Sequence, residues 1–139
     1  PSLYLSDANG KLRVSLSVSG KGPSLSLFDV NGKLRAALSV SGKGPSLYLL
    51  DANEKMEAVL DALEKGPSLN LYGANMERRT SIGVSNDDPS IKVYDEKGNF
   101  RAVLGVTSIE VTKTGETRKL PPSSLVLFDR DGKVSFQVP

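Results

Sequence analysis

The sequence predicts an all-β fold in which tandem 22-residue β-hairpins form an elongated rod. Three observations predict it: a fixed repeat, an apolar–polar alternation of period two within each repeat, and turn residues between the alternating segments. The repeat is marked by Pro-Ser pairs 22 residues apart, at Pro1, Pro23, Pro45, Pro67 and Pro89. Residues 1–22 and 23–44 differ at only 5 of 22 positions.

Each repeat contains two segments with the pattern of half-buried strands. In the first segment, Leu3 and Leu5 alternate with Ser2, Tyr4 and Ser6. The second segment has four apolar residues in alternation with Arg and Ser, namely Leu12, Val14, Leu16 and Val18. Because side chains of a strand point alternately to opposite faces, this pattern predicts one apolar face per hairpin.

Asn9-Gly10 predicts a two-residue type I′ turn between the two strands, because both central residues of that turn need positive φ. Such a loop pairs Leu5 with Val14 and Leu3 with Leu16, which keeps the apolar residues on one face. Related pairs recur at Asn31-Gly32, Lys97-Gly98 and Asp131-Gly132.

The connection to the next repeat, residues 19–24, is rich in Gly and ends in Pro23-Ser24. Gly and Pro interrupt regular structure, so this segment predicts a second turn. Pro23 would open the next strand at a position where no ladder hydrogen bond is needed.

Two repeats depart from the pattern. In residues 45–66 the turn glycine is absent, and Met56, Val59, Leu60 and Leu63 have helical spacing among good helix formers, so a local helix is the alternative to a strand there. In residues 67–88 the turn glycine is also absent, and Arg78 stands at the position of Leu12.

The chain is expected to be one repeat domain, residues 1–139. Its units are residues 1–22, 23–44, 45–66, 67–88 and 89–106, an insertion at 107–121, and a terminal unit at 122–139. The insertion predicts one further hairpin around Lys113-Thr114-Gly115-Glu116.

One hairpin buries too little apolar surface to offset the entropy of ordering it, so the units must stack. Three arrangements would then cover the apolar face: several chains around a shared axis, as in a β-prism-like homotrimer; a single-chain β-solenoid; or a rolled sandwich or barrel. The core residues are mostly Leu and Val, with 4 Phe, 4 Tyr and no Trp, which favours the narrow cores of the first two.

Composition excludes several kinds of chemistry. The chain has no Cys and no His, so disulfides, thiolate nucleophiles, Cys or His metal sites and a histidine acid/base are absent. With 18 basic and 16 acidic residues, a net charge of +2 gives no case for nucleic-acid binding. No apolar run is long enough for a membrane span.

Recurring carboxylates are candidate cation ligands. Asp ends the first strand of most repeats, at Asp7, Asp29, Asp51, Asp95 and Asp129. Because hard cations need several oxygens in one loop, we interpret these residues as turn flanks that pair with Lys11, Lys33 or the arginines Arg13, Arg35 and Arg101. Asp87-Asp88 and the Ser-Gly-Lys-Gly segments at 19–22 and 41–44 lack the ligand number and spacing of Ca²⁺ and phosphate sites. No catalytic, cofactor-binding or metal-ligating residues are predicted.

Two resemblances add to this interpretation. Residues 22–38, Gly-Pro-Ser-Leu-Ser-Leu-Phe-Asp-Val-Asn-Gly-Lys-Leu-Arg-Ala-Ala-Leu, resemble the repeats of adenovirus-type fibre shafts, which implies a triple β-spiral in a homotrimeric stalk. Two segments are similar to uncharacterised bacterial hairpin-repeat proteins: Tyr-Asp-Glu-Lys-Gly-Asn-Phe-Arg-Ala-Val-Leu-Gly at 94–105, and Ser-Leu-Val-Leu-Phe-Asp-Arg-Asp-Gly-Lys at 124–133. This second resemblance implies a location outside the cell.

The sequence therefore predicts a non-catalytic structural fibre or stalk module, extracellular or at the cell surface. Its expected partner is itself, as a homo-oligomer and by resemblance a trimer. One alternative is an adhesin-like module that binds polysaccharide or a surface protein through residues 45–88 or the insertion. The other alternative is a subunit of a head-to-tail filament, joined through exposed strand edges.

Overall fold

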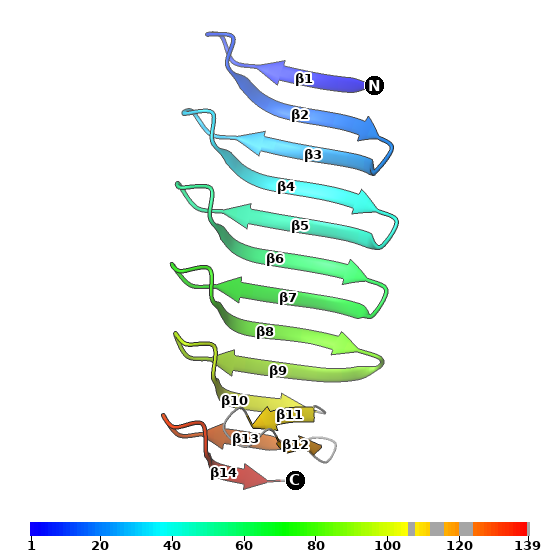
Figure 1. The fold of residues 1–139 in the computed structure, drawn as a ribbon. Helices are drawn as coiled ribbons and strands as arrows, with labels where there is room; N and C mark the ends of the chain where they lie inside the picture. The colour runs from blue at the N-terminus through cyan, green and yellow to red at the C-terminus, as the bar shows by residue number, and fades with distance from the viewer. Residues whose placement is uncertain (106–107, 112–115, 120–123, 139) are drawn as a thin grey trace.

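The structure is a computed structural model that describes residues 1–105, 108–111, 116–119 and 124–138. Twelve antiparallel strands form one open sheet, and each strand pairs with its neighbours in sequence except that β10 pairs with β13 (Figure 1). The strands are β1 (Ser2–Ser6), β2 (Leu12–Ser19), β3 (Gly22–Phe28), β4 (Leu34–Ser41), β5 (Gly44–Leu50), β6 (Met56–Leu63), β7 (Gly66–Tyr72), β8 (Arg78–Ser85), β9 (Asp88–Tyr94), β10 (Phe100–Gly105), β13 (Leu125–Phe128) and β14 (Val134–Val138).

The prediction of an all-β chain of hairpin repeats is confirmed. The insertion also contains the expected hairpin, because β11 (Ser108–Val111) pairs with β12 (Glu116–Lys119) in a separate sheet. Most of its predicted turn lies outside the described residues. Neither a triple β-spiral nor a solenoid coil is seen in the described part of the chain, whose main sheet stays open.

The turn within each hairpin differs from the predicted two-residue type I′ turn, and that prediction was wrong. The Asp7 N–H donates to the Lys11 carbonyl at 2.9 Å, and the Gly10 N–H donates to the Asp7 carbonyl at 2.9 Å. The loop therefore has three residues, of which only Gly10 has positive φ, at 76°.

The predicted strand pairing is nevertheless correct, because a β-bulge follows the turn. Ser6 lies opposite Leu12, and Leu5 lies opposite Val14, so Arg13 is an extra residue on the second strand. One extra loop residue and one bulge residue together restore the register that places Leu5 and Val14 on the same face.

The irregular repeats follow the same plan. The local-helix alternative was wrong: β6 is a strand, in which Leu60 pairs with Leu47 and Leu69. Glu54 and Met76 replace the turn glycines and adopt φ of 61° each, in the left-handed region that glycine occupies most easily. Pairing on both sides thus overrides both helix propensity and the loss of glycine.

The connection between repeats is a two-residue loop, with Ser19 paired to Gly22. Gly22 has φ of 117°, and a Cβ there would lie 1.9 Å from the Val40 carbonyl oxygen of the neighbouring strand β4. Gly44 and Gly66 make the same close approach. In the fourth connection Asp88 takes the glycine position, and Asn86-Asp87 adopt φ of 51° and 67°, which are type I′ values.

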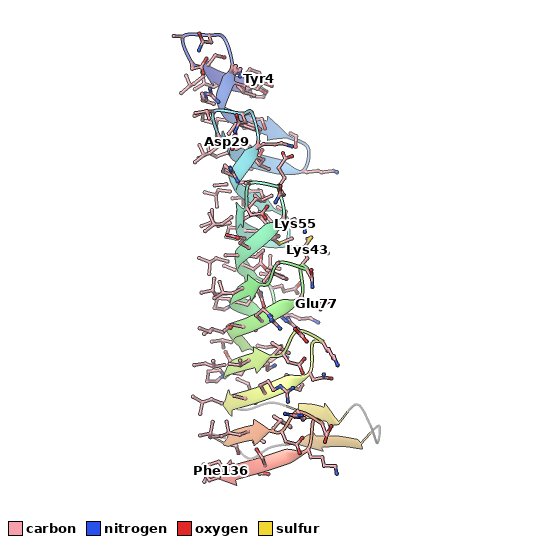
Figure 2. All side chains as sticks on the ribbon, turned by 90° about the vertical axis from the view of Figure 1, so that its left-hand side faces the viewer. Tyr4, Asp29, Lys43, Lys55, Glu77 and Phe136 are labelled. Atoms are coloured by element: carbon pink, nitrogen blue, oxygen red, sulfur yellow. The ribbon has the colours of Figure 1, made fainter. Side chains whose placement is uncertain are left out.

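The sheet has two chemically different faces. Figure 2 shows carbon-rich side chains along one side, where Phe136 is labelled, and polar side chains along the other, where Tyr4, Lys43 and Glu77 are labelled. In both views the β11–β12 hairpin lies against the polar side near β10 and β13. Val103 and Val126 are fully buried at this end and form a hydrophobic cluster with Phe128, against which Phe100 packs.

We predict that Gly22→Ala destabilises the sheet by about 2 kcal/mol or more, because the new Cβ meets backbone and the φ is strained. Chemical denaturation measures the change. Gly20→Ala is the matched control, since no heavy atom lies within 4 Å of its Cβ position. Equal effects of the two substitutions would show that the close approach to Val40 is unimportant.

Candidate functional site: an exposed apolar face

The apolar face consists of three parallel rows of side chains that run across the sheet. The middle row has one apolar residue from every strand of the twelve-stranded sheet, each paired with the next. Its members are Leu3, Leu16, Leu25, Leu38, Leu47, Leu60, Leu69, Ile82, Ile91, Leu104, Leu125 and Val138. The row is continuous because the bulge in each hairpin keeps the register constant.

The second row, here called the Asp-turn row, lies beside the turns that begin with Asp. Large and small residues alternate along much of it, as in Leu27, Ala36, Leu49, Ala58 and Leu71. The third row, here called the Pro row, lies beside the connections between repeats. It contains Val18, Pro23, Val40, Pro45, Ala62, Pro67, Val84 and Pro89.

This face is open to solvent in the single chain. Leu38 is 44% exposed, Leu60 is 49% exposed and Leu104 is 45% exposed, although they belong to the middle row. A shallow groove of about 620 Å³ between the middle and Pro rows is lined by Leu60, Ile82, Ile91 and Leu104 among others. Apolar patches of this extent on soluble proteins mark interaction sites.

The three rows contain no charged side chain, and Thr80 is their one polar residue in the described sheet. An uncharged face whose one hydroxyl belongs to Thr80 offers few groups to orient a polar substrate and no carboxylate to hold a metal ion. It can bind another apolar surface. The face was expected from the alternation, but its exposure in a single-layer sheet could not be read from the sequence.

The recurring Asp residues are held inside the turns, as the turn-flank interpretation predicts. Oδ1 of Asp7 accepts the N–H groups of Asn9 and Lys11 at 2.9 and 3.0 Å. Asp29, Asp51, Asp95 and Asp129 bind the corresponding N–H groups of their own turns. These carboxylates therefore satisfy backbone donors that a three-residue loop leaves unpaired.

The predicted Arg partners also lie beside these carboxylates. Arg13 pairs with Asp7, Arg35 Nε lies 2.8 Å from Asp29 Oδ2, and Arg101 Nη2 lies 2.8 Å from Asp95 Oδ2. Arg13 also donates to the Asp29 carbonyl, and Arg101 donates to the Asp129 carbonyl. Each of these two arginines thus joins its own turn to the turn of the next hairpin in the sheet.

The turn contacts lower the pKa of the carboxyl groups. The Lys11 N–H lowers the pKa of Asp7, with help from Arg13, and the Lys33 N–H lowers the pKa of Asp29. At Asp95 the Asn99 side-chain amide is the largest cause, and backbone N–H groups and Arg101 add to it, so the pKa falls to about 2. All of these contacts favour the ionised carboxylate.

Two substitutions interrupt this pattern in the irregular repeats. Glu57 stands where Arg13 and Arg35 stand in the first two repeats, and Gly73 stands where Asp7 and Asp29 stand. As a result Arg79 lacks its carboxylate, and its Nη1 is buried with no hydrogen-bond partner in the described structure. Arg78, at the position of Leu12, lies 5.0 Å from the ring centroid of Tyr94, a cation–π contact.

Gly73→Asp is predicted to stabilise the chain by about 1 kcal/mol, because it supplies the missing turn acceptor and a charged partner for Arg79. The new Cβ would lie 3.1 Å from Arg79 Nε, so this flexible side chain must shift slightly to meet the carboxylate. Thermal or urea unfolding measures the gain. Gly73→Asn is the matched control, since it restores the turn bonds without the charge and is expected to gain less. A loss of stability in both variants would contradict the assignment.

Acid should weaken these turns. Because the pKa of Asp95 is about 2 in the folded chain and its usual value is 3.8, its stabilising effect is complete above pH ~4 and is lost as the pH falls toward 2. Urea midpoints at pH 5, 3 and 2 measure this loss. Asp95→Asn keeps the turn acceptor and should reduce the pH dependence; an unchanged dependence would contradict the prediction.

The other candidates from the sequence do not converge on a site. Asp87 belongs to the type I′ turn between β8 and β9, and Gly20-Lys21 form the two-residue loop between the paired residues Ser19 and Gly22. Among the described residues there is no group of three or more acidic side chains placed to hold a metal, and no helix that could cross a membrane.

No protein-family model and no curated protein sequence matches the chain. Its function is therefore argued from the sheet itself.

Proposed function

We propose that the chain is a non-catalytic structural module, a fibre or stalk segment of an extracellular or cell-surface assembly. The observation that carries the proposal is the unbroken linear stacking of hairpins in a single sheet. At about 4.8 Å per strand, twelve strands extend roughly 53 Å along the stack. Addition of hairpins lengthens such a sheet without any change in its cross-section, which suits a spacer.

The use of the polar groups supports this proposal. The Asp carboxylates bind backbone donors within their turns, and Arg13 and Arg101 bind the following turn. The polar groups that recur in each repeat therefore stabilise the turns and the contacts between neighbouring turns. An enzyme would need side chains that converge on a cleft. The groove on the apolar face is uncharged, and a second groove of about 660 Å³ is lined by residues in and beside the turns, where Asp95 and Arg101 are bound to turn groups.

The proposed partner is the chain itself, in a homo-oligomer of three chains. The exposed apolar face supports self-association, and the resemblance to fibre shafts supports the number three. The location outside the cell rests on the similarity to bacterial hairpin-repeat proteins.

One alternative has an observation in its favour. Both edge strands of the main sheet, β1 and β14, are solvent-exposed along their length and have one unpaired edge. Such edges pair with other strands, so a head-to-tail filament remains the second candidate. The adhesin alternative has less support, because residues 45–88 keep the register of the regular repeats.

The proposal is tested by insertion of two further copies of residues 23–44 after residue 44. Each added hairpin contributes two strands, so the longest dimension of the particle should grow by about 19 Å, with an unchanged cross-section. Small-angle X-ray scattering measures both quantities. A particle that gains mass in all directions would overturn the linear-module proposal.

A further inference from the structure

We infer that the apolar face binds two further copies of this chain, and that three sheets surround a common axis with their middle rows at the centre. This inference rests on the proposed structural function and deepens it. It names the surface through which copies join, and it predicts which residues meet at the axis.

The area of the apolar face is that of a contact with another macromolecule. With strands about 4.8 Å apart and alternate residues about 6.8 Å apart, the three rows cover roughly 53 by 15–20 Å, or about 800–1,000 Å². A stable interface buries about 800 Å² on each partner. The face of one chain therefore has the size that a stable oligomer needs, and it far exceeds what a small ligand would cover.

The pattern of the face favours a second copy over an unrelated partner. The face is uncharged, so no electrostatic feature selects a different surface. The middle row runs through every strand of the sheet at one residue per strand. Another copy offers the same row with the same spacing over the whole length, whereas an unrelated partner would need an equally long apolar ridge.

The sizes of the side chains favour three sheets over two. Residues of the middle row are Leu or Ile except for Val138. The Pro row contains Pro, Val and Ala, and the central part of the Asp-turn row alternates Leu with Ala. A two-sheet sandwich has a uniform gap of about 10 Å and would suit equal sizes across the face. A triangular prism is deepest below the middle of each sheet and narrows toward its corners, which suits the long side chains of the middle row and the smaller average size of the flanking rows.

The dimensions agree with the prism. A seven-residue strand such as β3 is about 24 Å long, so three of them in a triangle place the middle of each sheet about 7 Å from the axis. A Leu side chain and its contact radius fill that depth. Because the axis runs along the stack, identical residues of the three chains meet at the same height.

The first experiment measures the mass in solution by size-exclusion chromatography with light scattering. We expect three times the 14.8 kDa chain mass. Leu38→Asp, at the centre of the face, should raise the dissociation constant at least a hundredfold, because it buries three carboxylates at the axis. Ser39→Asp is the matched control, since Ser39 is the next residue of β4 and points to the polar face.

A second experiment avoids variants that unfold. The chain has no Cys, so Leu38→Cys introduces one thiol in a side chain that stays apolar. A short bis-maleimide with a reach of about 12 Å should join Leu38→Cys chains to each other, because positions 7 Å from a threefold axis are about that far apart. It should fail with Ser39→Cys, whose thiols would lie on the outside.

Each result decides between the possibilities. A trimer that cross-links only through Leu38→Cys supports the inference. A dimer overturns the threefold arrangement, and a monomer overturns the binding of further copies. An oligomer that loses stability equally with Leu38→Asp and Ser39→Asp overturns the apolar face as the interface, while the lengthening of the particle on insertion of hairpins would still support the structural module.

Discussion

The bulge that follows each Asp turn is the constraint on which the sheet depends. A three-residue loop alone would place Leu5 opposite Arg13 and would move the second strand's apolar residues to the wrong face. The extra residue at Arg13 restores the pairing of Leu5 with Val14. The bulge also places the guanidinium of Arg13 within reach of Asp7 and of the Asp29 carbonyl in the next turn. Register and turn stacking are thus set by the same local irregularity.

Much of this fold could be predicted from the sequence, because the alternation of apolar and polar residues determines directly which side chains share a face. The alternation of Leu3, Leu5, Val14 and Leu16 defines one face in any pairing that keeps them together, and their pairing was correct. The turn type was not, because Asn-Gly also suits a three-residue loop when only glycine needs positive φ. The sequence has no residue that marks the bulge. It is recognised only when the three-residue loop and the strand register are both known.

The candidate site was only partly predictable for a related reason. The Asp–Arg contacts followed from charge and spacing, as Asp29 and Arg35 show. The exposure of Leu38 and Leu60 did not, since alternation states which side chains share a face and leaves open what covers that face. The unpaired Nη1 of Arg79 follows from the change to Gly73, which could have been found by comparison of equivalent repeat positions.

The direction of the strands has a mechanical consequence. Because the strands lie across the stack, tension applied to the two ends loads the hydrogen bonds of one hairpin at a time, in the manner of a zipper. A released hairpin of 22 residues extends to about 75 Å, whereas two stacked strands occupy about 10 Å. A single chain under load would therefore yield in steps of about 65 Å, and the sheet would behave as an extensible tether whose stiffness depends on what is packed against it.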